Sequence, residues 1–214
     1  MSWRGLVVFD IGGVLVRAGR TWVDDAERAG FAVSAAWRAE FEPRLLALPD
    51  RSIGGVESER YLALFAEASN GAYSRDDARR ITDASLIAEY PGVDRLFDAL
   101  DVARIPTAVL SNVNDAEWDR LFPAVGVDPE FPALRRVQHR FASHLIHVAK
   151  PDPRAFNEVE QGTGCSGVEI LFFDDRLENV NAARAFGWTA ELIDHTGDTV
   201  EQVLALLRVH SPAR

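Results

Sequence analysis

The sequence contains a single cysteine and no long apolar run. One thiol, Cys165, can form no disulfide within the chain, which fits a reducing compartment. A helix that crosses a bilayer needs about 20 consecutive apolar residues, and the apolar runs here are much shorter. The first of them is also too short for the apolar region of a signal peptide, and no small-residue cleavage site follows it. We therefore expect a cytoplasmic protein that has no membrane partner.

Positive charge is also scarce, with 23 lysines and arginines against 33 aspartates and glutamates and a net charge of −10. This imbalance argues against non-specific binding to nucleic acids, so we expect no nucleic-acid partner. It leaves room for a small anionic substrate, because a bound cation or local positive charge can override the global field. A chain of 214 residues fits one domain, or a core with a smaller inserted unit. The sequence gives no indication of the oligomeric state.

Short apolar runs alternate with helical patterns along much of the chain. Four runs are typical of buried strands, and they cover residues 6–9, 107–110, 170–173 and 189–193, with a weaker fifth near residues 140–143. The helical patterns between and after them cover residues 93–100, 117–122, 154–161, 177–186 and 200–209. Strands that alternate with helices of this length form βαβ units. The sequence therefore predicts an α/β protein with a Rossmann-like parallel sheet.

Residues 17–89 interrupt this alternation, because they hold helical patterns and no convincing strand. The last of these helices begins at Ser74, since Ser74 and Asp77 have the spacing of a capping box. We therefore predict two units. Residues 1–16 and 90–214 form an α/β core, and residues 17–89 form a small all-helical subdomain inserted after the first strand.

Polar side chains follow three of the predicted strands at the point where each strand ends. They are Asp10, then Ser111 and Asn112, then Asp174 and Asp175. Each alone is an ordinary helix N-cap, but parallel α/β sheets bind their ligands outside the carboxyl ends of the strands. Several carboxylates at one point repel each other unless a cation lies among them. The pattern therefore indicates a binding site that holds a metal ion.

Four segments that carry these residues resemble the motifs of the haloacid dehalogenase (HAD) superfamily, in the order in which that superfamily has them. They are Val7-Val8-Phe9-Asp10-Ile11-Gly12-Gly13-Val14-Leu15, Ala108-Val109-Leu110-Ser111-Asn112, Lys150-Pro151-Asp152-Pro153-Arg154-Ala155-Phe156 and Leu171-Phe172-Phe173-Asp174-Asp175-Arg176-Leu177-Glu178-Asn179-Val180. The resemblance implies a HAD-like core, with the helical insertion as a cap over the active site. It also implies a hydrolase, most often a phosphatase of small phosphorylated metabolites.

The resemblance assigns chemical roles to four residues. Asp10 is the expected nucleophile, which attacks phosphorus and forms an aspartyl-phosphate, so that one difficult displacement becomes two easier ones. Ser111 and Asn112 are expected to donate hydrogen bonds to phosphoryl oxygens. Lys150 is expected to hold the charge of both the nucleophile and the phosphate as a point cation.

The resemblance also implies a Mg²⁺ ion, which prefers oxygen ligands in octahedral geometry and usually keeps several waters. Asp10, the backbone carbonyl of Gly12 and Asp175 are the expected ligands. Asp174 is the expected outer or alternate ligand. Asn179 stands where many relatives carry a further aspartate.

One position departs from the phosphatase pattern. These phosphatases usually carry a second aspartate two residues after the nucleophile as general acid and base, and here that position is Gly12. General acid–base catalysis contributes about 10²–10⁴-fold to a rate. Its loss is expected to slow the enzyme without necessarily abolishing activity, and a Gly-Gly form of the first motif recurs in the superfamily.

Three interpretations of the chain stay open. The first is a Mg²⁺-dependent phosphatase of a small metabolite. The second is a haloacid dehalogenase, which uses the aspartate against carbon and needs no metal. It ranks lower, because those enzymes typically carry an aromatic residue at the position of Gly12 and because paired Asp174 and Asp175 favour a cation. The third is a non-catalytic module that binds a phospho-ligand or a partner protein.

Near the predicted cap entrance, Arg17 and Arg20 are interpreted as solvated charges, and His195 as a loop histidine.

Overall fold

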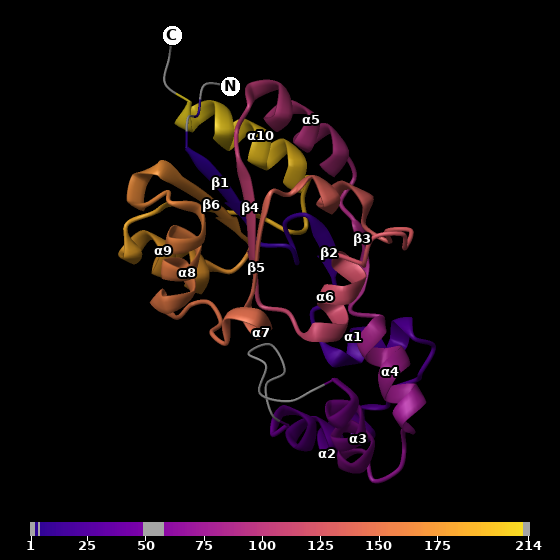
Figure 1. Ribbon diagram of the computed structural model, residues 1–214. Coiled ribbons are helices and arrows are strands. Elements are labelled where there is room, and N and C mark those ends of the chain that lie inside the picture. Colours follow the sequence, from indigo (N-terminus) through magenta and orange to yellow (C-terminus); the bar gives the residue numbers. More distant parts are fainter. Residues whose placement is uncertain (1–2, 4, 49–57, 212–214) are drawn as a thin grey trace.

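The computed structural model describes residue 3, residues 5–48 and residues 58–211 (Figure 1). The two predicted units also include residues 1–2, 4, 49–57 and 212–214, which lie outside the described residues. A five-stranded sheet with the order β5-β4-β1-β6-β7 forms the centre, and every neighbouring pair in it is parallel. Its strands are β1 (Leu6–Phe9), β4 (Thr107–Ser111), β5 (His139–Ala142), β6 (Ile170–Asp174) and β7 (Thr189–Leu192).

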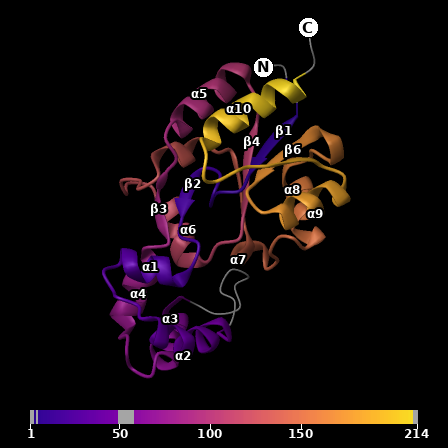
Figure 2. The ribbon, with the colours of Figure 1, turned by 180° about the vertical axis from the view of Figure 1, so that it is seen from behind.

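Helices cover both faces of this sheet, and this is why its strands are continuously apolar. Figures 1 and 2 show α5 (Val93–Ala103) and α10 (Thr199–His210) on one face and α8 (Pro153–Thr163) and α9 (Leu177–Phe186) on the other. In β1, Val7 and Phe9 pack into the cluster that contains α5 and α10 residues. Leu6 and Val8 pack into the cluster with α8 and α9. Successive side chains of a strand point to opposite faces, which is why β1 contributes to both clusters. The predicted α/β fold with a parallel sheet is confirmed.

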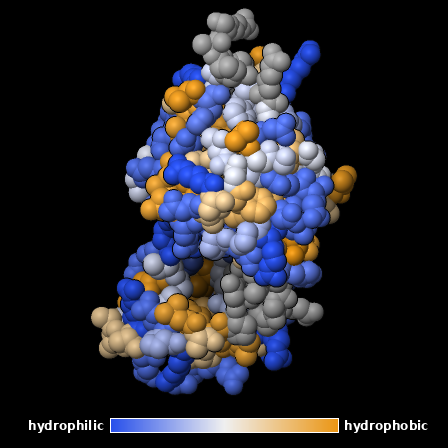
Figure 3. Space-filling model, turned by 90° about the vertical axis from the view of Figure 1, so that its left-hand side faces the viewer, coloured by the Kyte–Doolittle hydropathy of each residue, from blue (hydrophilic) through white to orange (hydrophobic). Residues whose placement is uncertain are grey.

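Four helices form a separate block beyond the carboxyl ends of the strands (Figure 1). They are α1 (Trp22–Arg28), α2 (Ala35–Leu46), α3 (Ser58–Ala68) and α4 (Arg75–Asp83). The block has its own buried core, in which Phe41, Phe65 and Tyr73 pack together. The predicted capping box at Ser74 is present, because Ser74 and Asp77 exchange hydrogen bonds at the start of α4. Figure 3 shows the block as a lower mass below the larger core, with mostly hydrophilic residues and scattered hydrophobic patches on this face.

Two short strands join the helical block to the core, where the sequence predicted no strand between residues 17 and 89. They are β2 (Val16–Ala18) and β3 (Leu86–Glu89), which pair antiparallel, with Val16 opposite Glu89 and Ala18 opposite Leu86. The prediction was wrong at both ends of the segment, because strands of three and four residues are too short to establish a periodicity. Their pairing also depends on residues about 70 positions apart.

Helix α6 (Asp115–Leu121) is a core element that contacts the helical block. The Ser58 hydroxyl at the start of α3 donates to the carboxylate of Asp115. Arg120 donates to the carbonyl of Asp83 at 2.5 Å, and the Ser85 hydroxyl donates to Glu117 Oε1 at 3.2 Å.

The remaining elements are the helix α7 (Ser143–Ile146) and the 3-10 helices η1 (Pro132–Arg136) and η2 (Gly167–Glu169). Within the described parts of the chain, the helices are too short and too polar for any to span a bilayer.

Candidate active site

Asp10, Ser111 and Asp174 meet at one edge of the sheet because β1 lies between β4 and β6. Asp10 directly follows β1, and its backbone N–H donates to the carbonyl of Phe173 at 2.8 Å, which continues the sheet by one residue. Ser111 ends β4 and Asp174 ends β6. All three side chains are buried. The predicted gathering of polar groups at the strand ends is therefore present.

Lys150 lies between two of these carboxylates and is itself buried. Its Nζ atom is 3.0 Å from Asp10 Oδ1 and donates to Asp174 Oδ2 at 2.7 Å. Burial alone would lower the pKa of Lys150, but the charges of Asp10 and Asp174 outweigh it and hold that pKa above its ordinary value. The ammonium group is therefore a fixed positive charge beside the predicted nucleophile.

The side chain of Asn112 fixes the backbone of Lys150. Asn112 Nδ2 donates to the carbonyl oxygen of Lys150 at 2.8 Å, and Asn112 Oδ1 accepts from the N–H of Lys150 at 2.9 Å. The amide of Asn112 was expected to bind phosphoryl oxygens, whereas in the structure both amide atoms hold the backbone of Lys150. Spacing along the chain gave no signal of this contact, because it joins residues 38 positions apart.

Asp174 is saturated with hydrogen-bond donors. Besides Lys150, the backbone N–H of Arg176 donates to its Oδ1 at 2.8 Å, and Asn179 Nδ2 lies 3.1 and 3.0 Å from its two oxygens. The carboxylate is fully buried. These bonds fix the position of Asp174, which in turn fixes the ammonium group of Lys150.

Burial dominates the electrostatics of Asp10. Loss of solvent raises its pKa, Lys150 lowers it, and the neighbouring Asp174 raises it again, with the pKa ending at about 6. The hydroxyl of Ser111 also favours the ionised form. Without a further cation, the carboxyl group of Asp10 therefore carries a proton at moderately acidic pH, at which an exposed aspartate is already ionised.

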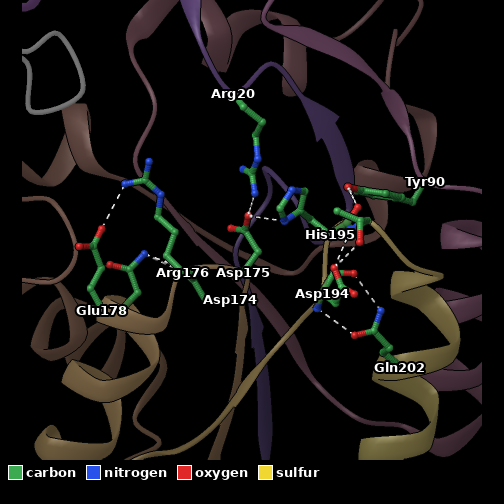
Figure 4. Close-up of polar contacts among 11 residues, drawn as sticks. Arg20, Tyr90, Asp174, Asp175, Arg176, Glu178, Asp194, His195 and Gln202 are labelled. Atoms are coloured by element: carbon green, nitrogen blue, oxygen red, sulfur yellow. Dashed lines mark hydrogen bonds and ion pairs between the residues drawn. The ribbon is translucent and has the colours of Figure 1, made fainter.

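Asp175 faces the helical block, and Figure 4 shows Arg20 pointing directly at it. The guanidinium group of Arg20 forms an ion pair with Asp175 Oδ2, and His195 Nδ1 lies 3.8 Å from the same oxygen. The Tyr90 hydroxyl donates to the carbonyl oxygen of His195 at 2.8 Å and holds this loop beside the site. Arg20 and His195 were interpreted as a solvated charge and a loop histidine. Arg20 is exposed, as interpreted, but it pairs with Asp175, and His195 lies in a loop, as interpreted, beside the same carboxylate.

A cavity of about 360 Å³ lies between the sheet edge and the helical block, and Asp10, Lys150 and Asp175 are in its wall. The wall of the cavity contains all of the predicted site residues except Asp174. Asp174 is fully buried and bonded to Lys150. The block and its connections contribute as well, through Ala18, Gly19, Arg20, Ser85 and Leu86. A cavity with one buried cation and several carboxylates suits a small anion held together with a divalent metal.

Residues 5–187 match the family model described as haloacid dehalogenase-like hydrolase. The chain belongs to this family. A curated relative, Phosphatase MT3486 of Mycobacterium tuberculosis, is 29% identical over 148 residues, which cover 69% of this chain and 65% of the relative. The chain thus spans slightly less than two thirds of that relative's length.

Solved structures share the fold of this family member along most of its length. A HAD-like family hydrolase from Porphyromonas gingivalis has a TM-score of 0.76, 21% identity and coverage of 97% and 99% of the two chains. The HAD family enzyme bt-2542 from Bacteroides thetaiotaomicron, in complex with magnesium and inorganic phosphate, has a TM-score of 0.71, 19% identity and coverage of 91% and 96%. L-2-haloacid dehalogenase from Xanthobacter autotrophicus, with chloropropionic acid covalently bound, has a TM-score of 0.60, 18% identity and coverage of 100% and 85%. At these identities the likeness extends to the fold alone.

The acidic residues of this hydrolase fit a divalent cation. Asp10, Asp174 and Asp175 each offer a carboxylate oxygen, and these oxygens lie within 4.8 Å of one another. Asp10 Oδ1 is buried and, among the described residues, forms no hydrogen bond, although it lies 3.0 Å from the Lys150 ammonium group. Hard oxygen donors at this spacing are what Mg²⁺ requires.

Gly13 provides the space that Asp175 occupies in this HAD-like hydrolase. Its φ is +79°, and a Cβ atom placed there would lie 2.4 Å from Asp175 Oδ2. We expect Gly13→Ala to strain the loop and displace Asp175, lowering the free energy of unfolding by about 1–3 kcal/mol. Chemical denaturation measures this effect. Gly71, with φ of +77° and nothing within 4 Å of an added Cβ, is the matched control. An equal loss in Gly71→Ala would contradict a specific effect on Asp175.

Proposed function

We propose that the chain is a Mg²⁺-dependent phosphatase that acts on a small phosphorylated metabolite through an aspartyl-phosphate on Asp10. The observation that carries this proposal is the contact of the buried Lys150 ammonium group with Asp10, at the wall of a cavity that also holds Asp175. A relative named as a phosphatase supports it, as does a solved enzyme of the same fold in complex with magnesium and inorganic phosphate.

Each predicted residue has a part in this reaction. Asp10 attacks phosphorus, and Lys150 orients the carboxylate and offsets the negative charge that gathers on the transferring group. The Ser111 hydroxyl donates to a phosphoryl oxygen. Asn112 positions Lys150 through the two backbone bonds described above, a role that differs from direct phosphate binding.

Asp10, Asp175 and the backbone carbonyl of Gly12 are the groups that would hold Mg²⁺. Asp174 is the outer group, because both of its oxygens already accept hydrogen bonds. When bound, the ion supplies positive charge that lowers the repulsion between the nucleophile and the phosphate. Arg20 must leave Asp175 or share it when the ion binds.

The helical block is proposed to act as a cap over the cavity. Residues 17–89 then form the cap, and residues 1–16 and 90–214 form the core. The paired strands β2 and β3 make a double connection on which a cap can rotate, and the contacts of α6 hold it closed. A closed cap excludes water from the reaction and selects the substrate.

A panel of phosphorylated metabolites tests this function. We expect release of inorganic phosphate that requires Mg²⁺ and stops when EDTA is added. Chloride release from 2-chloropropionate that is indifferent to EDTA would instead indicate a dehalogenase. If neither phosphate nor chloride is released, and calorimetry still shows that phosphate or a phospho-ligand binds, the chain is a binding module.

The affinity for Mg²⁺ is expected to depend on pH through Asp10. Its pKa of about 6 in the metal-free protein means that the carboxyl group is protonated below pH 6, and metal ligands bind in the deprotonated form. The dissociation constant for Mg²⁺ should therefore rise about tenfold for each pH unit below 6, and stay level above it. Titration calorimetry at pH 5, 6 and 7.5 measures it. An affinity that is constant across this range would contradict the prediction.

Removal of Arg20 is expected to tighten Mg²⁺ binding, because the ion pair with Asp175 competes with the metal. Arg20 is partly exposed, and an exposed ion pair contributes about 0.2–1 kcal/mol, so Arg20→Gln should raise the affinity by about 1.4- to fivefold. Arg17→Gln removes a charge from the neighbouring exposed position and is the control. Equal changes in the two variants would show a general effect of charge.

A further inference from the structure

Position 12 cannot transfer a proton, so a phosphatase built on this chain needs another group for that step. Hydrolysis through an aspartyl-phosphate needs an acid that protonates the departing ester oxygen and a base that activates water. Because Gly12 has no side chain, the proton must come from another group near the place where the leaving group passes.

A second cavity, of about 200 Å³, adjoins the first on the side of the helical block. Its wall includes the aromatic and apolar residues Trp22, Tyr61, Phe65 and Ile81 among polar ones. The two cavities share four wall residues, Gly19, Arg20, Ser85 and Glu117. A phosphate beside Asp10 and Lys150 lies in the first cavity, so the second is where the rest of the substrate extends. The shared residues then surround the bond between phosphorus and the leaving group.

Glu117 is held at this junction by both halves of the molecule. It lies in the first turn of α6, close after the end of β4, and its Oε2 accepts from the backbone N–H of Asn114 at 3.3 Å. From the helical block, the Ser85 hydroxyl donates to Oε1 at 3.2 Å. The carboxylate is therefore bonded both to the core, through Asn114, and to the helical block, through Ser85.

The other ionisable groups near this junction fit the task less well. Arg20 stays protonated at any pH of interest and cannot act as a base. Asp25 lines the second cavity but not the first, and His195, beside Asp175, is in the wall of neither. Among the described residues that both cavities share, Glu117 alone carries a carboxyl group.

We propose that Glu117 is the general acid and base of this site, in place of the aspartate that Gly12 lacks. This inference rests on the proposed phosphatase function. In the first step a carboxylate oxygen of Asp10 bonds to phosphorus, the bond from phosphorus to the ester oxygen breaks, and that oxygen takes the proton of Glu117. In the second step the Glu117 carboxylate takes a proton from water, the water oxygen bonds to phosphorus, and the bonding electron pair returns to Asp10. The sum is ester plus water giving alcohol plus phosphate.

Glu117→Gln tests this role and keeps the local fold, because glutamine also serves in a capping box. The first step is measured as alcohol released in a single turnover with enzyme in excess. An alkyl phosphate has a poor leaving group, and we expect its release to slow by about 10²–10³-fold. A p-nitrophenyl phosphate needs no acid, so its release should slow by less than about tenfold. The variant should then accumulate the aspartyl-phosphate, seen as a burst of nitrophenol followed by slow turnover.

Two further variants make the test specific. Asp119→Asn removes an exposed carboxylate from the same helix and should change neither rate. Gly12→Asp has room for its side chain, since an added Cβ meets only Ala18 Cβ at 3.5 Å. In the Glu117→Gln background it should raise alkyl phosphate release by at least about tenfold and in the wild-type background by much less, whereas equal gains in the two backgrounds would show that Glu117 is only structural.

The outcomes separate this inference from the function on which it rests. If the wild type releases phosphate but Glu117→Gln slows both esters equally, or neither, the role of Glu117 is refuted and the phosphatase stands. If the wild type hydrolyses neither ester in the presence of Mg²⁺, the phosphatase proposal fails, and the role of Glu117 fails with it.

Discussion

Asp10→Asn is expected to abolish phosphate release, with a loss in kcat on the order of 10⁶-fold, the scale seen when an enzyme loses its nucleophile. The amide has the shape of the carboxyl group but cannot form the acyl-phosphate bond. The measurement is phosphate release at saturating Mg²⁺, together with mass spectrometry of acid-quenched enzyme for the phosphorylated Asp10 peptide. We expect the phosphopeptide in the wild type only.

Stability separates this loss from misfolding. Because burial raises the pKa of Asp10, the folded state favours an uncharged group at this position. The metal-free Asp10→Asn protein should therefore resist denaturant at least as well as the wild type at pH 7.5. A phosphopeptide on another residue of the variant, or a residual rate within about 100-fold of the wild type, would contradict the assignment of Asp10.

Lys150→Met is expected to reduce both stability and activity, because it leaves Asp10 and Asp174 buried without their cation. Removal of one partner of a buried ion pair costs about 3–5 kcal/mol. We expect a decrease of this size in the free energy of unfolding of the metal-free protein at pH 7.5, measured by urea denaturation. Phosphate release should fall as well, since the transferring group loses its fixed positive charge.

The double variant Lys150→Met with Asp174→Asn distinguishes the two effects. Replacing Asp174 removes one uncompensated charge, so part of the lost stability should return while the activity stays low. The matched comparison is Asp174→Asn alone, in which Lys150 keeps its contact with Asp10. A decrease in stability below about 0.5 kcal/mol in the single variant would show that the two carboxylates are solvated or protonated without Lys150.

The parts of the site that lie on the sheet could be predicted from the sequence. Apolar runs such as residues 6–9 and 170–173 mark strands that are covered on both faces. Parallel strands put their carboxyl ends on the same edge, so Asp10, Ser111 and Asp174 were expected at that edge, and the strand order β4-β1-β6 places them side by side. The edge at which each side chain lies therefore follows from the apolar run that marks its strand and from the rule that parallel strands end at the same edge.

The contacts between the sheet and the helical block could not be predicted in this way. Arg20 reaches Asp175 across 155 positions of sequence, and Ser85 reaches Glu117 across 32. Such contacts depend on how two packed units sit against each other, which no periodicity encodes. Asn112 is a similar case, because its residue type suited phosphate binding and only the geometry showed that it binds the backbone of Lys150.

The pairing of β2 with β3 has a consequence for how this chain can change. Ala18 and Leu86 lie opposite each other, so the polypeptide leaves the core and returns to it at a single point. A tight turn could join these two residues without altering any strand of the sheet. The helical block is therefore an exchangeable module, and a block from another family member could be grafted at this point. The sheet would keep Asp10, the proposed nucleophile, while the graft replaced the part of the cavity wall that holds Arg20 and Ser85, so that the two parts of the wall can change separately.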